Sequence, residues 1–320
     1  MSEPASLRAR MRAAAVGLIA GLDEHQRALC RLPFADQGRC RFTYLPRSRP
    51  GVCLADLDRP GHKAAQRLLA TGLSPSAYAQ AAAVMALEEV LDRREGWRRG
   101  RHANDYWVVI FGDPAGSEPW AWRWEGHHLS VSVTIDGAEI FVAPLFLGAH
   151  PARVSVAGWP VIRPFGVEED LAHTLLEAMR PAARGLAVVA SSAPSDIRSS
   201  TLPSVLGQIT PLGVGAGQMD PASRALLEQL TTVYLSRLPE DMAVREATGL
   251  PDSDLHFAWE GPIRQGSGHY YRIQAEGLLI EYDNTSHDAN HVHTVLRRPG
   301  RDFGGQGSSA GWAGPAADHE

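Results

Sequence analysis

Two short stretches, far apart in the sequence, concentrate the side chains that proteins use most often as metal ligands. One is Glu125-Gly126-His127-His128-Leu129-Ser130, and the other is Asn290-His291-Val292-His293. Neutral imidazole binds transition metals and titrates near neutral pH. Because side chains alternate along a strand, His291 and His293 should project from one face, roughly 6.5 Å apart. With a third ligand from another strand, they predict a site for Fe, Cu or Zn.

The first stretch should supply the third ligand, but the sequence leaves open which histidine it is. If residues 120–135 form one strand, Glu125 and His127 share a face and His128 lies on the other. Burying a carboxylate or an imidazole without a partner is costly. We therefore expect His127 or His128 to join His291 and His293. Glu125 would be a ligand, a general base or a residue that orients a histidine.

Three residues outside the histidine pairs complete the predicted site. Glu281 lies on the strand before the His-x-His segment and is expected to be a fourth ligand or the general base. His269 and Arg297 are expected to contact the substrate. Arg297 falls on the same strand face as His291 and His293, and its guanidinium group suits an anionic substrate.

These residues predict a metal-dependent enzyme that acts on a small molecule. Three protein ligands with an open position suit either water activation or dioxygen chemistry. We favour an oxidoreductase slightly over a hydrolase, because aromatic and histidine-rich sites suit Fe or Cu. Two alternatives stay open. One is a metal-free hydrolase or lyase that uses the same His and Glu groups as acids and bases. The other is a non-catalytic protein that binds a small ligand, stacked on Trp120, Trp122 and Trp124.

The composition argues against nucleic acids and membranes as binding partners. The 320 residues carry a net charge of −5, which lacks the basic excess typical of nucleic-acid binding. No apolar stretch is long enough to span a membrane, and we interpret residues 7–22 as a short amphipathic helix rather than a signal peptide. Three widely spaced cysteines indicate no disulfide framework. A cytoplasmic location is therefore expected, and the oligomeric state stays open.

Hydrophobic patterns indicate which elements carry these residues. Ser74-Pro75 and Asp220-Pro221 resemble helix starts, and Asp136-Gly137 resembles a hairpin turn. Helices are predicted at 7–22, 63–70, 78–91, 168–179, 221–238 and 242–247. Strands are predicted at 41–44, 106–111, 120–135, 139–142, 255–259, 269–274, 278–282 and 291–296. Residues 191–217, rich in Ser, Pro and Gly, should form an irregular loop that could cover the site.

The order of these elements predicts an α+β fold with a largely antiparallel sheet and helices packed around it. We expect residues 1–306 to form one domain whose sheet takes strands from both β-rich regions. Residues 307–320, rich in Gly, Ser and Ala, should form a flexible tail.

Several segments, in this order along the chain, match a known family: Gly21-Leu22 with Gln26-Arg27, Ile110-Phe111-Gly112, Trp120 to Ser130, Gly148-Ala149-His150-Pro151-Ala152, Ala193-Pro194-Ser195-Asp196-Ile197, His269-Tyr270-Tyr271-Arg272-Ile273-Gln274, Leu279-Ile280-Glu281-Tyr282-Asp283-Asn284, and Ala289-Asn290-His291-Val292-His293 with Asp302-Phe303-Gly304. On these segments, roughly residues 18–306 resemble the domain of unknown function 3500 (DUF3500) family. The resemblance implies that the histidines and carboxylates of the family signature form a shared site, and it implies no reaction. The sequence differs from the family at His150, where Asn is usual, and at Arg298, where Asp usually follows the arginine.

Overall fold

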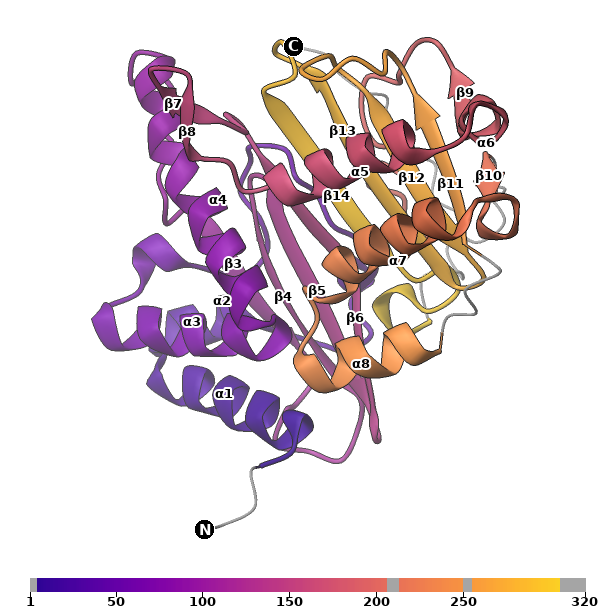
Figure 1. Ribbon diagram of the computed structural model, residues 1–320. Coiled ribbons are helices and arrows are strands. Elements are labelled where there is room, and N and C mark those ends of the chain that lie inside the picture. The colour runs from indigo at the N-terminus through magenta and orange to yellow at the C-terminus, as the bar shows by residue number, and fades with distance from the viewer. Residues whose placement is uncertain (1–4, 206–212, 250–254, 306–320) are drawn as a thin grey trace.

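One twisted sheet organises the chain in the computed structural model, which describes residues 5–205, 213–249 and 255–305 (Figure 1). Its strands follow the order β1-β3-β4-β5-β6-β14-β13-β12-β11-β10, with β2 also paired to β3 and β9 also paired to β11. Only β1 with β3 and β9 with β11 are parallel among the described strands. The predicted α+β class with a largely antiparallel sheet is therefore confirmed.

The two β-rich regions meet where β6 pairs with β14, so the sheet takes strands from both. The strands of the first half are β1 (Arg31–Leu32), β2 (Val52–Cys53), β3 (Tyr106–Phe111), β4 (Trp120–Gly126), β5 (Leu129–Asp136) and β6 (Glu139–Ala149). Those of the second half are β9 (Val188–Ala190), β10 (Val214–Gly215), β11 (His256–Glu260), β12 (Tyr270–Ala275), β13 (Leu278–Ser286) and β14 (His291–Arg297). A separate hairpin joins β7 (Val154–Val156) to β8 (Trp159–Ile162).

Helices cover one face of the sheet, as Figure 1 shows from the front. The starts expected at Ser74-Pro75 and Asp220-Pro221 are confirmed, because Ser74 and Asp220 accept hydrogen bonds from backbone N–H groups in the first turns of α4 and α7. The helices are α1 (Leu7–Gly21), α2 (Glu24–Cys30), α3 (Arg59–Gly72), α4 (Pro75–Arg94), α5 (Gly166–Ala178), α6 (Pro181–Ala187), α7 (Pro221–Leu235) and α8 (Glu240–Thr248). No helix among the described residues is both long and apolar enough to cross a bilayer.

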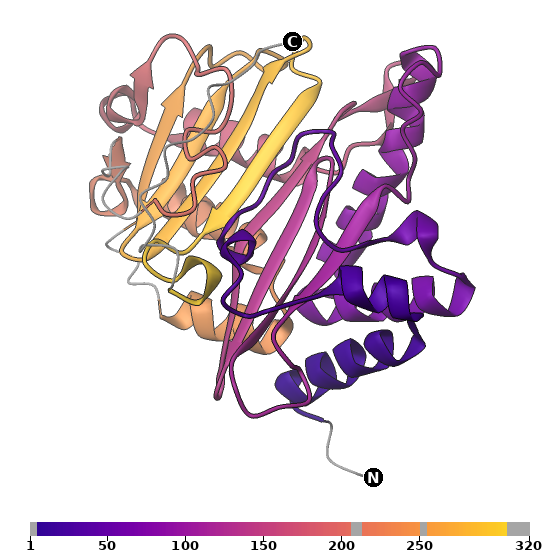
Figure 2. The ribbon, with the colours of Figure 1, turned by 180° about the vertical axis from the view of Figure 1, so that it is seen from behind.

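The opposite face is covered by extended segments instead of helices (Figure 2). On the helix side, the sheet presents mainly apolar side chains such as Trp124, Leu147 and Ile280. On the other side, it presents buried charged groups, among them Glu125, Arg272 and Glu281. Buried charges need partners. Arg272 finds its partner within the sheet, at Glu260, whereas Glu125 and Glu281 also bind the covering segments, through Arg49 and through the backbone of Ser199.

Two predicted elements differ from the structure. Residues 120–135 do not form one strand, because the chain reverses at His127-His128 and β4 pairs with β5 as a hairpin. Residues 41–44 run beside the sheet without joining it as a strand. The proposed tail at 307–320 lies outside the described residues, as do residues 206–212 of the predicted loop.

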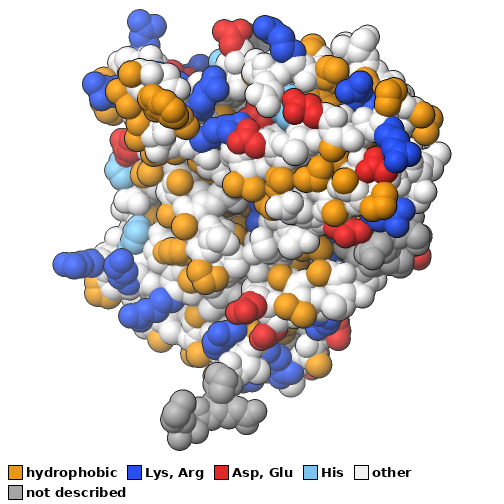
Figure 3. Space-filling model, in the orientation of Figure 1, with side chains coloured by type: hydrophobic (Ala, Val, Ile, Leu, Met, Phe, Trp, Pro, Cys, Tyr) orange, Lys and Arg blue, Asp and Glu red, His pale blue; other side chains and the backbone are white. Residues whose placement is uncertain are grey.

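The front surface carries acidic and basic side chains side by side (Figure 3). Its hydrophobic side chains gather over the β7–β8 hairpin, where Val156, Trp159 and Val161 are exposed.

Candidate metal centre

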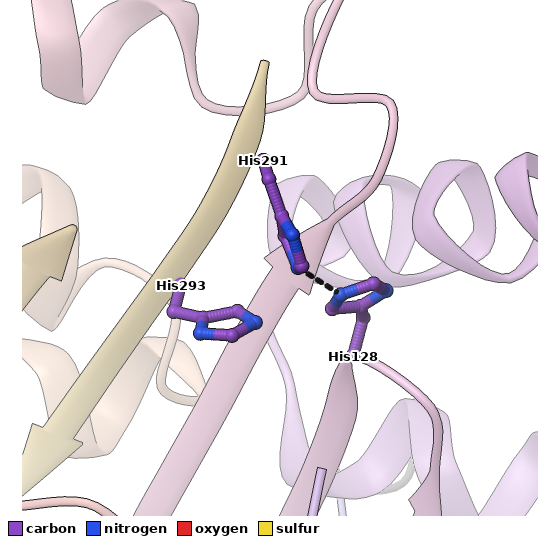
Figure 4. Close-up of side chains that lie close together, drawn as sticks. All are labelled: His128, His291 and His293. Atoms are coloured by element: carbon purple, nitrogen blue, oxygen red, sulfur yellow. Dashed lines mark hydrogen bonds between the residues drawn. The ribbon is translucent and has the colours of Figure 1, made fainter. Parts of the chain in front are cut away.

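Three imidazole rings converge on the face of the sheet that the extended segments cover (Figure 4). His291 and His293 project from β14, and His128 projects from the turn between β4 and β5. The Nε2 atoms of His128 and His291 lie 2.8 Å apart. The ring of His293 lies 4.6 Å from that of His291 and 5.4 Å from that of His128, measured between centroids. We call these three residues the histidine trio.

Backbone geometry brings His128 to the trio in place of His127. His128 has a φ of 61°, so the chain turns sharply there and the ring points across β6 toward β14. The carbonyl oxygen of His128 accepts a hydrogen bond of 2.7 Å from the N–H of Gly148 on β6. The sequence left open whether His127 or His128 joins the trio. The turn conformation at His128 decides this, and the alternation of side chains along a strand does not predict such a turn.

Gly148 makes room for the rings. It pairs with His293 across β6 and β14. A Cβ atom at this position would lie 3.0 Å from Cδ2 of His293, 3.1 Å from Cδ2 of His128 and 2.6 Å from the carbonyl oxygen of Val292. A side chain at position 148 would therefore separate the trio.

The outer nitrogen atom of each trio ring faces a further side chain. Nδ1 of His293 lies 2.7 Å from Oδ1 of Asp196. Nδ1 of His128 lies 3.6 Å from Oε1 of Glu88, and Nδ1 of His291 lies 3.2 Å from Nδ1 of His287. Carboxylates on the outer nitrogen are typical of histidines that bind metals, because they fix the ring and its tautomer. The inner Nε2 atoms are then left to face one another.

Burial keeps His128 and His291 in the neutral form that binds metals. It lowers the pKa of His128 and His291, and the neighbouring imidazoles lower the pKa of both rings further. Burial alone would raise the pKa of Glu88, but hydrogen bonds from His127 and His128 lower it to about 2. At neutral pH, the rings of His128 and His291 are therefore uncharged and Glu88 is ionised.

Two further groups of side chains border the trio. His150 stacks on His291 with ring centroids 4.6 Å apart, so the residue that departs from the family pattern extends the cluster. His127 turns away to Glu88, with Nδ1 2.7 Å from Oε1. His127 and Glu88 line a pocket of about 370 Å³. The wall of this pocket also carries Arg47, Arg49, Arg99 and Arg101.

Three predicted site residues make polar contacts with residues other than the trio. Glu125 forms ion pairs with Arg49 and Arg123, at 3.2 and 3.1 Å. Glu281 accepts hydrogen bonds from the Tyr270 hydroxyl and from the backbone N–H groups of Arg198 and Ser199. Arg297 is fully buried, pairs with Asp302 at 2.8 Å and donates to the Leu202 carbonyl. These three residues therefore hold the segments around the trio in place, and none of these contacts is with a trio ring.

His269, the fourth such residue, lies on the other face of the sheet. Its neighbour Tyr270 pairs with Asp283, which in turn pairs with His293, so Tyr270 shares the face of His293. His269 points the opposite way and stacks between Trp259 and Tyr282. The structure does not bring His269 to the trio.

Sequence reasoning did not single out Glu88, Asp196 or His287. Glu88 lies within α4 and Asp196 within the covering loop, so no local spacing connects either residue to a histidine. Asp196 does fall in the Ala193-Pro194-Ser195-Asp196-Ile197 segment that carries the family resemblance. That segment was the one sequence signal that could have pointed to Asp196 as part of the site.

The comparisons with known proteins agree with this resemblance. The model of a family described as "Protein of unknown function (DUF3500)" matches residues 5–305, nearly the whole chain. The chain belongs to the DUF3500 family. No curated protein and no solved structure matches it. For this DUF3500 chain, several groups of His, Asp and Glu are close enough to hold a metal ion, and the trio is one of them.

Proposed function

We propose that the protein is a metal-dependent enzyme whose ion is held by Nε2 of His128, His291 and His293. The observation that carries the proposal is that the two nitrogens of each ring have different surroundings. The outer nitrogens face Glu88, Asp196 and His287, while the inner ligand atoms lie within 4.8 Å of one another. Three imidazole ligands and an open position suit Zn, Fe or Cu.

The surrounding residues would position the ligands. Asp196 holds the ring of His293, and Tyr44 donates a hydrogen bond of 2.9 Å to the second oxygen of Asp196. Glu281 holds the backbone of Arg198 and Ser199, directly after the segment that carries Asp196. We infer that Glu281 acts on the site through the loop, as a positioning residue and not as a base.

The substrate is proposed to be a small anionic molecule that enters beside His127. The pocket there is lined by four arginines, and Arg47 and Arg99 are exposed at its rim. The ring of His127 lies 3.7 Å from that of His128, so this pocket adjoins the trio. Arginine side chains bind carboxylates and phosphates through paired hydrogen bonds.

Redox chemistry is favoured over hydrolysis. A hydrolytic site benefits from a carboxylate that takes a proton from water. Here Asp196 is engaged by His293 and Tyr44, and Glu88 is engaged by His127. A bound Fe or Cu ion would supply one-electron or dioxygen chemistry that needs no such base. The protein would contribute orientation, the arginine-lined pocket and a shielded environment.

One observation favours a second function, metal-free acid/base catalysis. His127 and Glu88 form a hydrogen-bonded pair at 2.7 Å, and both line the arginine-lined pocket. Such a pair transfers protons without a metal ion. Full activity in chelator-treated protein would favour this function over the metal-dependent one.

Metal content tests the proposal. Untagged protein would be analysed by plasma mass spectrometry beside the variant His291→Ala/His293→Ala. His25→Ala would serve as control, because His25 is exposed on α2 and outside the groups that could hold an ion. The trio variant should lose one equivalent of Fe, Cu or Zn per chain, and the control should lose none. Equal metal content in both variants would contradict the proposal.

A further inference from the structure

A second group of potential ligands lies on the helix-covered face of the sheet. Glu169 and His173 stand one turn apart on α5, so they share one side of that helix. His269 approaches them from the residue before β12, with its ring 5.0 Å from that of His173 at 74°. One ligand atom from each residue lies within 4.8 Å of the others. We call these three residues the helix-side site.

Both imidazoles of the helix-side site carry a buried nitrogen without a hydrogen bond. Within the described part of the chain, Nε2 of His173 and Nε2 of His269 have no partner. The side chains are almost completely buried, at 2% and 0% exposure. A buried polar atom without a hydrogen-bond partner destabilises the folded state, so two such atoms side by side need an explanation.

The tautomer of His269 makes its buried nitrogen a ligand. Nδ1 of His269 lies 2.9 Å from the carbonyl oxygen of Ser267, and a carbonyl can only accept. Nδ1 therefore carries the proton, and Nε2 presents its lone pair. A backbone carbonyl on the outer nitrogen is the same device that orients histidines in metal sites.

Stacking alone does not explain His269. Trp259 lies parallel to the ring at 4.2 Å and Tyr282 at 5.4 Å, between centroids. These contacts fix the plane of the ring, and a phenylalanine would make them equally well. An imidazole adds only its two nitrogen atoms, of which one is satisfied by Ser267 and the other points to the helix-side site.

The carboxylate of the site is also held from outside. Oε2 of Glu169 accepts a hydrogen bond of 2.8 Å from Arg163, and Oε1 lies 3.3 Å from Nδ2 of Asn284. Asn284 also accepts a hydrogen bond of 2.7 Å from the backbone N–H of His269. Its neighbour Asp283 belongs to a group with Asp196 and His293 on the other face. Consecutive residues of β13 thus serve the two sites.

A pocket gives the helix-side site access to solvent. It has a volume of about 400 Å³ and is lined by Glu169 and His173, together with Arg153, Arg163 and Asp170. Two imidazoles and one carboxylate leave coordination positions open, and here those positions would face the pocket.

We propose that Glu169, His173 and His269 bind a second divalent transition-metal ion, Zn or Fe, with its open positions toward this pocket. The donor set of two nitrogens and one carboxylate oxygen is typical of Zn and non-haem Fe sites. The ion would satisfy both unpartnered nitrogens. The proposal does not depend on the trio, because the two groups share no residue and lie on opposite faces of the sheet.

The test counts ions site by site. Untagged, chelator-stripped protein would be titrated with Co²⁺, which reports each site by its visible absorption, and with Zn²⁺ followed by plasma mass spectrometry. The key variant is His269→Phe, which keeps the stacking on Trp259 and removes the ligand. Glu169→Gln keeps the side-chain volume, removes the anionic ligand and also removes the ion pair with Arg163. Exposed Glu276→Gln is its matched control.

Wild-type protein should bind two ions per chain. His269→Phe should bind one, and His291→Ala/His293→Ala should bind the other with a different Co²⁺ spectrum. Glu169→Gln should weaken the helix-side ion at least tenfold, and Glu276→Gln should not change it. The proposal is overturned if His269→Phe and Glu169→Gln both bind as many ions as wild type. Should His269→Phe not fold, Glu169→Gln decides alone. Loss of the trio ion alone would leave this result intact.

Discussion

The histidine trio and the helix-side site use the same side chain on opposite faces of one sheet, but they hold it differently. In the trio, side chains from α4, the loop at Asp196 and the turn at His287 face the outer nitrogens. In the helix-side site, the outer nitrogen of His269 meets a backbone carbonyl and aromatic rings fix its plane. The trio therefore depends on distant segments, whereas the helix-side site depends on one helix and the edge of one strand.

This difference determines how each site responds to change. The ligands of the trio are assembled by the covering loops, so loosening a loop should weaken that site alone. The ligands of the helix-side site belong to packed core, where burial lowers the pKa of His269 to about 3. Variants of the covered face should therefore separate the two sites.

Gly148→Ala should have the largest effect, because its Cβ would collide with the Val292 carbonyl and two trio rings. We expect the free energy of unfolding to fall by about 3 kcal/mol, near the upper end for overpacking. The trio ion should be lost and the helix-side ion retained. Urea denaturation and metal content measure both effects. Gly17→Ala is the control, since open space surrounds Gly17 in α1 and the change should stabilise the helix slightly.

Glu281→Gln should come next. The variant keeps the volume but replaces a charged acceptor of two backbone N–H groups and the Tyr270 hydroxyl. We expect a loss of about 2 kcal/mol in the free energy of unfolding. The trio should bind its ion more weakly, because the loop with Asp196 is no longer held. Equal weakening of both ions in a Co²⁺ titration would contradict the separation of the sites.

Asp196→Asn should weaken the trio ion without unfolding the protein. The amide cannot hold Nδ1–H of His293 as the carboxylate does, and the loss of such a partner typically costs about 10- to 100-fold in metal affinity. Competition with a chelator of known affinity measures the change. The matched variant on the other face is Asn284→Ala, which should affect only the helix-side ion.

Tyr44→Phe should have the smallest effect. The ring would keep its stacking on Phe146, with centroids 4.3 Å apart, and lose one hydrogen bond to Asp196. Loss of this hydrogen bond should weaken binding of the ion at the trio by about 1 kcal/mol, which is a few-fold decrease in affinity. If Tyr44→Phe weakened binding as strongly as Asp196→Asn, the tyrosine would have to touch the ion or the substrate directly.

Much of the fold follows from local patterns. Caps at Ser74 and Asp220, the turn at Asp136-Gly137 and the period-two pattern of β12 to β14 all depend on neighbours in the sequence. The common face of His291 and His293 follows from the same alternation. The reversal at His127-His128 could not be predicted, because apolar and polar residues alternate on both sides of it and imitate one long strand.

The remainder of the site depends on contacts between distant segments. Glu88 meets His127 and His128 only because α4 packs beside β5, and Asp196 meets His293 only because a loop crosses the sheet. Likewise, strand alternation correctly puts His269 and Tyr270 on opposite faces of the sheet. The sequence does not tell which of these two faces carries the trio. Local spacing predicts which side chains share a strand face, and packing decides which faces meet.

The adjacency of Asp283 and Asn284 on β13 has a consequence for sequence change. Because strand neighbours point to opposite faces, inserting or deleting one residue before Asp283 would exchange their directions. The carboxylate would then enter the aromatic layer around Trp259, and the amide would face Asp196. A shift of register by one residue would thus weaken ion binding at both proposed sites at once. Point substitutions can therefore change one site without the other, whereas a change in the length of β13 would alter both.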